Sequence, residues 1–393
     1  MDFSLTSEQQ ALKDSVRRFC EREYAFEARR GLLRSDEGFS RGNWATFAEL
    51  GWLGAGLPEA LGGYGGGAVE NALILEELGR ALALEPFLPC AVGAAQAIAA
   101  AATGEARESL LAAIVSGETL AVLAHAEAGA RGGADEHVET RAERTSAGWR
   151  LTGAKAFVLG GPAADVLLVS ARTSGGPRDR EGVSLFQVRP DLGGVTRRSY
   201  LAVDGRRVAD FTFDGVELAA EALLGHAGQA IEPIELALDH TLVGLCAEAL
   251  GAMEAALWMT RDYLRTRRQF GVTLNTFQAL QHRMADMLVE TELARSMLYR
   301  ALAALEATDP AERRSGVSAA KAQIGEAGYF VGGHAVQLHG GVGVTEEYAV
   351  GHFFKRLTLV RGLGGPTDVH LARFARLSRR PGRNSSGASL AAE

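Results

Sequence analysis

Apolar side chains recur every three or four residues along three long segments in the C-terminal half of the chain. These segments cover residues 234–263, 277–305 and 317–338. This spacing places the apolar residues on one face of an amphipathic α-helix. Gly271 and Asn275 lie between the first two segments and are typical of a turn. The pattern therefore predicts a long helical hairpin followed by a third long helix.

The N-terminal part of the chain also shows a helical pattern. Thr6 and Gln9 have the spacing of a capping box, and an apolar stripe follows them. Further helices are expected at 44–53, 69–83, 89–102 and 106–115. A glycine-rich run at 62–67 has no preceding strand and no βαβ context, so we interpret it as a loop and not as a phosphate-binding turn.

Short apolar or alternating runs replace the helical pattern in the middle of the chain. They are separated by Gly, Pro and Asp and lie at 120–124, 149–151, 156–159, 166–170, 183–188 and 208–213. Such runs predict a small β domain. We therefore expect an α+β protein with a helical domain at 1–118, a β domain at 119–226, a helix-bundle domain at 227–380 and a disordered tail at 381–393.

Composition narrows the class of protein. Among 393 residues, 41 Lys and Arg face 48 Asp and Glu, a net charge of −7, and 47% of the residues are hydrophobic. Without a basic excess, we expect neither nucleic acid nor membrane as a partner. The three cysteines lack metal or redox spacing, so no metal site is expected. The N-terminus does not resemble a signal peptide, and the cytoplasm is the expected location.

Two arginines mark the predicted turn of the helical hairpin. Arg267 and Arg268 precede Gln269, Phe270 and Gly271. An arginine offers a rigid fork of donors that suits a phosphate group. The same residues also suit an ordinary charged helix end that is closed by a glycine. The hairpin alone leaves both interpretations open.

This stretch resembles the R-x-Q-F-G…F-Q…Q-H…A-D-M signature of the acyl-CoA dehydrogenase family. The resemblance continues at both ends of the chain, through Leu50–Gly63 and through Gln337–Tyr348. The sequences of residues 247–253 and 350–357 are similar to those of the small subunit of pimeloyl-CoA dehydrogenase. The resemblance implies an acyl-CoA dehydrogenase-like fold, with an N-terminal helical domain, a small middle β domain and a C-terminal four-helix-bundle domain.

The resemblance also implies FAD as the cofactor, bound where two subunits meet. In the family, the hairpin reaches the FAD of a neighbouring subunit. The residues that match cofactor-binding positions are Arg267, Gln269, Phe270, Gln278, Gln337, Gly340, Gly341, Phe157, Leu159 and Asp368. The implied reaction is α,β-dehydrogenation of an acyl-CoA thioester, which needs a carboxylate as base.

The chain departs from the family at the residues that carry this chemistry. Gly364 and Thr241 stand where members of the family carry the catalytic glutamate. Asp239 is a weak candidate for the base. Leu159 replaces a threonine and cannot donate a hydrogen bond, and Leu242 replaces an arginine. A glycine at 364 would leave room for a bulky acyl group.

Three functions are compatible with this pattern. The chain is an FAD-dependent acyl-CoA dehydrogenase or a subunit of a heteromeric one, in which a second chain supplies the base. Alternatively it is a flavin-dependent enzyme of another class, such as a monooxygenase, or a non-catalytic partner subunit. We expect a homodimer or homotetramer, or a heteromer with a second acyl-CoA dehydrogenase-like chain. Fold analogy alone does not choose among these functions.

Overall fold

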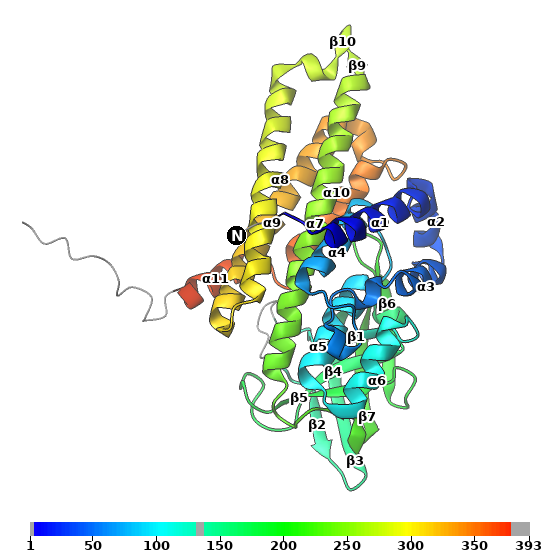
Figure 1. Cartoon of the computed structure of the whole chain (residues 1–393), viewed down its shortest axis with the longest axis vertical. Helices are drawn as coiled ribbons and strands as arrows, with labels where there is room; N and C mark the ends of the chain where they lie inside the picture. The colour runs from blue at the N-terminus through cyan, green and yellow to red at the C-terminus, as the bar shows by residue number, and fades with distance from the viewer. Residues whose placement is uncertain (1–3, 131–136, 379–393) are drawn as a thin grey trace, which may run out of the picture.

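The computed structural model describes residues 4–130 and 137–378, which form three regions that pack against one another (Figure 1). The N-terminal helices lie beside the long C-terminal helices, and the β-sheet lies below them in this view. The α+β class and the order of helical, β and helical regions are as predicted. The tail expected at 381–393 lies outside the described residues.

Over its described residues, the N-terminal region contains six α-helices joined by short helical turns. They are α1 (Ser7–Glu23), α2 (Phe26–Arg34), α3 (Arg41–Glu49), η1 (Trp52–Gly54), η2 (Glu59–Leu61), α4 (Ala68–Arg80), η3 (Leu88–Ala94), α5 (Ala95–Ala101) and α6 (Gly104–Val115). The capping box at the start of α1 is confirmed. The Thr6 hydroxyl accepts the Gln9 N–H at 3.2 Å, and the Gln9 side chain accepts the Thr6 N–H at 3.1 Å.

Two of the predicted N-terminal helices are broken. The helix expected at 44–53 ends with α3 at Glu49, because Gly51 takes a left-handed conformation with φ of 75°. The helix expected at 89–102 begins as the π-helical segment η3 and becomes α-helical only from Ala95. Gly93 in this segment approaches α7 so closely that a Cβ there would lie 3.1 Å from the Thr241 hydroxyl.

The middle region is a twisted, mostly antiparallel sheet. Its strands are β1 (Ala121–Ala124), β2 (Arg141–Arg144), β3 (Gly148–Leu159), β4 (Val166–Arg172), β5 (Val183–Val188), β6 (Val195–Leu201), β7 (Arg207–Ala219) and β8 (Leu223–Leu224). The spatial order is β6-β7-β3-β2-β4-β5-β8, and β1 pairs in parallel with β4.

The strand pattern differs from the prediction in several ways. The two runs expected at 149–151 and 156–159 belong to the single strand β3, whose pairing with β7 shifts register after Leu151 and after Lys155. These irregularities interrupt the alternation of apolar residues. Strands β2 and β6 were not predicted, because β2 is mostly polar and β6 is an exposed edge strand.

The C-terminal region is a bundle of long helices with a protruding hairpin. Its elements are α7 (Ile231–Thr266), β9 (Arg268–Gln269), β10 (Val272–Thr273), η6 (Leu274–Thr276), α8 (Gln278–Leu305), α9 (Pro310–His339), η7 (Gly340–Val344), α10 (Ala349–Gly362) and α11 (Thr367–Ser378). Helix α7 is apolar and long enough to cross a bilayer, yet 78% of its apolar window is buried inside the protein. It is therefore the central helix of the core, packed against α4, α8, α9 and α10.

Candidate functional site

A cavity of about 580 Å³ lies where the three regions meet. Segment η3, helix α7, the end of α10, the loop after β1 and the end of β3 all contribute to its wall. Most of the lining is aliphatic, including Leu88, Leu123, Leu238, Leu242, Leu245, Leu359 and Leu363. The volume is within the range of small-molecule sites, and the lining suits an apolar ligand.

A glycine turn closes the cavity at the end of α10. Gly364 and its neighbour Gly365 both line the cavity, with φ values of 71° and 113°. A Cβ at Gly364 would lie only 2.5 Å from a methyl carbon of Leu242. The prediction of free room beside Gly364 is therefore wrong, because the Leu242 side chain already fills that space. Neither glycine offers a carboxylate to the cavity.

Two buried side chains that do not line the cavity hold this turn. The Lys321 ammonium donates to the carbonyls of Arg361 at 3.2 Å and Gly365 at 3.3 Å. The His370 imidazole lies 3.1 Å from the Gly364 carbonyl. Burial lowers the pKa of His370 to about 3, so this ring is neutral. The turn is thus a firmly bonded helix end.

The other acidic and hydroxyl candidates are engaged elsewhere. Thr241 lines the cavity, but its hydroxyl donates to the Ala237 carbonyl one turn earlier in α7 at 2.7 Å. Asp239 is buried, does not line the cavity, and accepts from the Arg313 guanidinium at 2.8 Å. Asp368 is exposed at the start of α11 and also lies outside the cavity lining. None of the three presents a free base to the cavity.

Phe157 and Leu159 line the cavity from the end of β3. Phe157 has an unusual positive φ of 52°, and the Asp210 carboxylate accepts its N–H at 2.9 Å. The Phe157 ring packs edge-on against Tyr200, with 6.3 Å between ring centroids. A strained backbone of this kind is often found at a ligand site, and Phe157 adds an aromatic residue to the cavity lining. Leu159 adds apolar surface and no donor.

Glu127 is the one carboxylate among the described residues that line the cavity, and the sequence did not single it out. The Lys155 ammonium donates to it at 2.6 Å, and the N–H groups of Glu139 and Thr140 donate at 2.6 and 3.1 Å. Burial alone would raise the pKa of Glu127, but Lys155 and these hydrogen bonds bring it below its usual value. Glu127 is therefore ionised and fully bonded, which makes it an anchor for the loop after β1.

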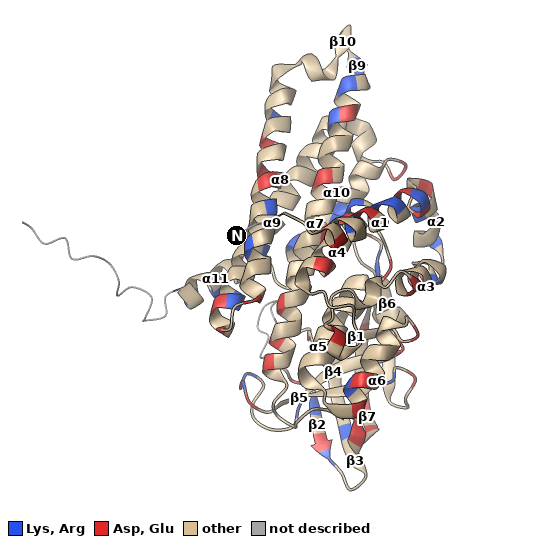
Figure 2. Cartoon of the chain, in the orientation of Figure 1, with Lys and Arg blue, Asp and Glu red and all other residues tan. Residues whose placement is uncertain are grey.

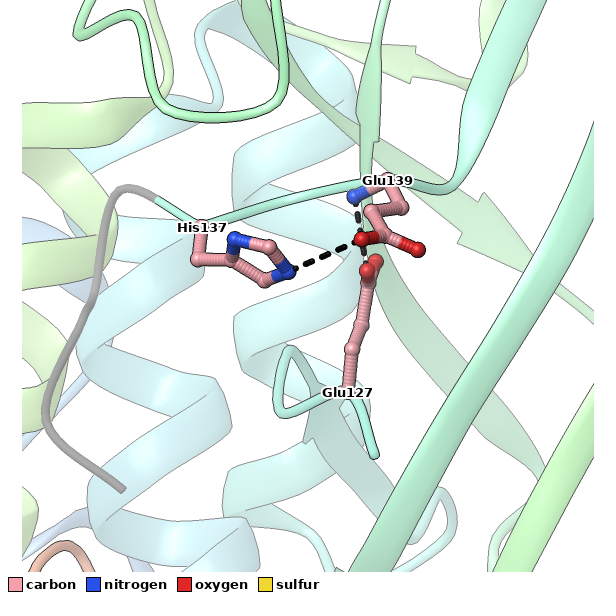
Figure 3. Close-up of side chains that lie close together, drawn as sticks. All are labelled: Glu127, His137 and Glu139. Atoms are coloured by element: carbon pink, nitrogen blue, oxygen red, sulfur yellow. Dashed lines mark hydrogen bonds and ion pairs between the residues drawn. The ribbon is translucent and has the colours of Figure 1, made fainter. Parts of the chain in front are cut away.

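Figure 3 shows His137 and Glu139 close to Glu127. Ligand atoms of the three side chains lie within 4.8 Å of one another, a spacing that would suit a metal ion. The fully buried Lys155 already neutralises Glu127, however, and burial lowers the pKa of Lys155 only to about 8. A second cation at this carboxylate would face that ammonium. The cluster therefore serves as a structural ion pair.

The predicted cofactor-binding residues of the hairpin are all exposed. Phe270, at the tip between β9 and β10, is 88% exposed, and Arg267 and Gln278 flank the tip (Figure 1). Arg267 has no ion-pair partner among the described residues. Figure 2 shows basic segments where α7 reaches β9, at the far end of the molecule. The hairpin thus presents polar and aromatic groups that its own chain does not cover.

The turn after α9 lies next to the base of this hairpin. Tyr263 stacks on His339, with 4.4 Å between ring centroids, and its hydroxyl donates to the His339 carbonyl at 3.3 Å. Gln337, Gly340 and Gly341 are exposed beside this contact. A Cβ at either glycine would meet nothing within 4 Å, so the turn is an open surface.

The site residues therefore form two groups on one chain. About 24 residues of α7 separate Leu242 in the cavity from Arg267 at the hairpin, a distance of roughly 35 Å along a helix. A single ligand on one subunit cannot touch both groups by this route. The arrangement fits a hairpin that serves a neighbouring subunit.

Three domain descriptions match the chain in sequence. They are "Acyl-CoA dehydrogenase, N-terminal domain" over residues 6–118, "middle domain" over 123–216 and "C-terminal domain" over 231–378. The chain belongs to the acyl-CoA dehydrogenase family. Members of this family are oxidoreductase flavoenzymes of fatty acid metabolism.

Relatives of this acyl-CoA dehydrogenase-family chain cover almost its whole length. An acryloyl-CoA reductase (NADH) from Anaerotignum propionicum is 30% identical over 96% of this chain and 95% of its own. A variant of the Tcur3481-Tcur3483 steroid ACAD is 31% identical, with a TM-score of 0.84 over 94% and 97% of the two chains. The ChsE4-ChsE5 complex from Mycobacterium tuberculosis is 29% identical, with a TM-score of 0.86 over 97% and 100%.

The two groups of residues fit FAD to different degrees. At the hairpin end, the exposed Arg267 guanidinium and the open Gly340–Gly341 turn suit a pyrophosphate and the nucleotide beside it. At the cavity, Phe157 offers a ring, while Leu159 offers no donor. Ala130, in the loop that Glu127 anchors, offers no hydroxyl either. The hairpin end of this acyl-CoA dehydrogenase-family chain is thus the better equipped part of a flavin site.

The sequence carries only a weak signal for the pair of Glu127 and Lys155 beside the cavity. Lys155 lies between the runs expected as strands at 149–151 and 156–159, and a buried lysine needs a carboxylate partner. That requirement predicts an acidic residue in the neighbouring loop, and in the structure this residue is Glu127. The contact between Leu242 and Gly364 had no sequence signal, because the two residues are 122 positions apart (364 − 242).

Proposed function

We propose that this chain is one subunit of a heteromeric FAD-dependent acyl-CoA dehydrogenase. In this assembly, Arg267, Gln278, Gln337 and the Gly340–Gly341 turn contact FAD that is bound mainly by a second, related chain. That second chain carries the catalytic carboxylate. When bound, FAD accepts the β-hydrogen of the acyl thioester as hydride.

One observation carries this proposal. Among the described residues that line the cavity, the only carboxylate is Glu127, and Lys155 and two backbone N–H groups already occupy it. Abstraction of the α-proton needs a basic group within hydrogen-bond reach of the substrate. The hairpin, by contrast, keeps its exposed Arg267. The chain is thus better suited to complete a neighbour's flavin site than to run the reaction alone.

The relatives and the surface support a mixed assembly. The ChsE4-ChsE5 complex and the Tcur3481-Tcur3483 steroid ACAD each carry two component names. Helix α8 exposes Leu288, Val289 and Leu293, and such apolar positions are typical of an interface when they gather on one helix. A closer likeness to the pimeloyl-CoA dehydrogenase small subunit remains part of the proposal, as does a cytoplasmic location.

The substrate we propose is an acyl-CoA with a bulky apolar acyl group. The large aliphatic cavity and the likeness to a steroid ACAD support this choice. The principal alternative is a flavin enzyme of another class, such as a monooxygenase, which needs no base for an α-proton. The absence of a carboxylate side chain at Gly364 and Gly365 favours this alternative.

The chain purified alone is expected to show little or no dehydrogenase activity on butyryl- to palmitoyl-CoA. Co-purification with the product of a neighbouring acyl-CoA dehydrogenase gene is expected to give a yellow complex of larger mass, whose flavin is bleached anaerobically by an acyl-CoA. The measurements are light scattering, the absorption spectrum and the rate of flavin reduction. Rapid turnover by the chain alone would overturn the proposal and make Glu127 and Asp239 the first residues to mutate. A yellow complex that no acyl-CoA reduces would favour the monooxygenase alternative.

Replacing Arg267 by alanine is expected to weaken FAD binding by roughly 1.5–3 kcal/mol, because a charge-assisted hydrogen bond to the pyrophosphate is lost. The measurement is the flavin content of the assembled protein during a titration with FAD. The matched control is Arg265→Ala, which removes an exposed arginine from the last turn of α7 and leaves the hairpin unchanged. Equal FAD affinity in the two variants would remove Arg267 from the flavin site.

A further inference from the structure

Two glycines in the wall of the large cavity face consecutive residues of α7. A Cβ at Gly93 of η3 would approach the Thr241 side chain, and a Cβ at Gly364, in the turn after α10, would approach that of Leu242. All four residues line the cavity. At this level of the cavity, α7 therefore presents two side chains, and the facing positions of η3 and of the turn present none.

The two glycines differ in the room beside them. A Cβ at Gly364 would lie 2.5 Å from a Leu242 methyl carbon, and φ there is 71°, so this position is closed to other side chains. A Cβ at Gly93 would meet only two heavy atoms within 4 Å besides its chain neighbours and the backbone of its own helix. These atoms are Thr241 Oγ1 at 3.1 Å and the Leu88 carbonyl oxygen at 3.6 Å. Position 93 therefore opens mostly into the cavity that it lines.

The backbone does not require a glycine at position 93. Its φ lies outside the left-handed region that favours glycine. A glycine inside a helical segment also destabilises that segment relative to alanine, because glycine loses the most conformational freedom on folding. Gly244 of α7, by contrast, has a packing reason, since a Cβ there would lie 2.7 Å from methyl carbons of Leu75 and Leu88. The effect that remains for Gly93 is the room that its missing side chain leaves in the cavity.

Gly93 lies in the π-helical segment η3. In this segment the Ala95 N–H bonds to the Cys90 carbonyl, which is the i→i+5 pattern of a π-helix. Short π-helical segments are rare and are frequent at functional sites. Leu88, Pro89 and Gly93 all line the cavity, so the irregular segment is itself part of the cavity wall.

We propose that Gly93 determines which acyl groups the cavity accepts, by leaving room beside Thr241 for a saturated hydrocarbon ring. This inference rests on the proposed function, because it takes an acyl-CoA as the ligand. A ring fills the space at position 93 and contacts the wall there, whereas a straight chain leaves that space empty and forgoes those contacts. The Thr241 hydroxyl already donates to the Ala237 carbonyl at 2.7 Å, and Leu88 and Leu238 add aliphatic surface, so this part of the wall suits hydrocarbon.

The test compares two thioethers of CoA, S-decyl-CoA and S-(cyclohexylbutyl)-CoA. Their alkyl groups have the same number of carbons and differ in width. A thioether has no acidic α-proton, so its binding is measured without any dehydrogenation. The dissociation constants are measured by titration calorimetry on the assembled protein loaded with FAD. The unchanged protein is expected to bind the cyclohexyl compound more tightly than the decyl compound.

Gly93→Val is expected to weaken binding of the cyclohexyl compound by at least about tenfold relative to the decyl compound, because the new side chain and the ring compete for one space. Gly93→Ala is expected to act in the same direction with a smaller effect. Adding Thr241→Ala to Gly93→Ala removes the hydroxyl that the new Cβ would press on, and is expected to restore the preference for the ring. The control is Gly31→Val on the exposed side of α2, where a Cβ would meet nothing within 4 Å, and it should change neither constant.

The outcomes separate this inference from the proposed function. An unchanged preference in folded Gly93→Ala and Gly93→Val would overturn the inference and leave the proposed function intact. Failure of the assembled protein to bind either thioether would contradict the proposed function, and the inference with it. A crystal structure of the complex with S-(cyclohexylbutyl)-CoA is expected to show the ring in contact with the Cα of Gly93, and a ring bound elsewhere would overturn the inference.

Discussion

Replacing Gly364 by glutamate and Leu242 by alanine in the same chain is expected to create flavin reduction by acyl-CoA at least about 100-fold faster than in the matched glutamine variant. This is the typical gain from a positioned general base. The matched variant is Leu242→Ala with Gly364→Gln, which has the same shape at 364 and no carboxylate. The measurement is the anaerobic rate of flavin bleaching in protein loaded with FAD.

Both substitutions are needed because residues 242 and 364 compete for the same space. A Cβ at Gly364 would lie 2.5 Å from Cδ2 of Leu242, and φ at Gly364 is 71°. A side chain at this φ costs about 1 kcal/mol or more even without a clash. Gly364→Glu alone is therefore expected to lower the unfolding temperature. Leu242→Ala removes the clash, so the double variant should be more stable than the sum of the single effects predicts.

The double-variant experiment also tests where the reaction would take place. If the glutamate and glutamine variants reduce at the same low rate while both retain FAD, the cavity of this chain does not hold the thioester near residue 364. A glutamate at 365, which also lines the cavity, is the next position to try. Failure of both would leave the neighbouring chain as the only site of chemistry.

The sequence predicted the helical framework well, because its signals are local. The three- and four-residue spacing of apolar side chains located α7, α8 and α9, and the Thr6–Gln9 capping box marked the start of α1. The proposed domain boundaries fall between α6 and β1 and between β8 and α7. Edge strand β6 escaped prediction because both of its faces are largely exposed, which removes the apolar alternation by which a strand is recognised.

The candidate site was less predictable, because its decisive contacts join distant parts of the chain. Arg313 pairs with Asp239, and Leu242 fills the space beside Gly364. Both contacts depend on how the helices pack. Sequence motifs indicated which residue types stand at the matching positions, but not which neighbours occupy them. The Glu127–Lys155 pair shows the same limit, since each residue is unremarkable in its own segment.

The second large effect concerns the ion network that joins the three regions. Arg356 on α10 is 1% exposed and donates to Asp204 in the β6–β7 turn at 2.6 Å, to Glu248 on α7, and to the Ala83 carbonyl at 3.2 Å. Arg356→Met would leave two buried carboxylates with Arg206 as their remaining charged partner. Breaking such a buried network typically costs 3–5 kcal/mol, so we expect a loss of about this size in the free energy of unfolding. The measurement is urea unfolding at pH 7.

The stability of the same variant is expected to fall less on acidification than that of the unchanged protein. Burial alone would raise the pKa of Asp204, but the charges of Arg206 and Arg356 hold it well below its usual range. A carboxyl with a lowered pKa stabilises the fold above its unfolded pKa of about 3.9, and this contribution is lost as the pH falls below that value. Without Arg356 the pKa of Asp204 rises toward this unfolded value, so the stability lost on acidification becomes smaller. The control variant is Arg361→Met, because Arg361 lies on the same helix as Arg356 and forms a half-exposed pair with Glu326 of α9. This variant should cost less than about 1 kcal/mol at pH 7 and leave the acid dependence of stability unchanged. Equal losses in the two variants would mean that the buried network contributes no more than a surface pair, and that the packing of α10 alone holds the three regions together.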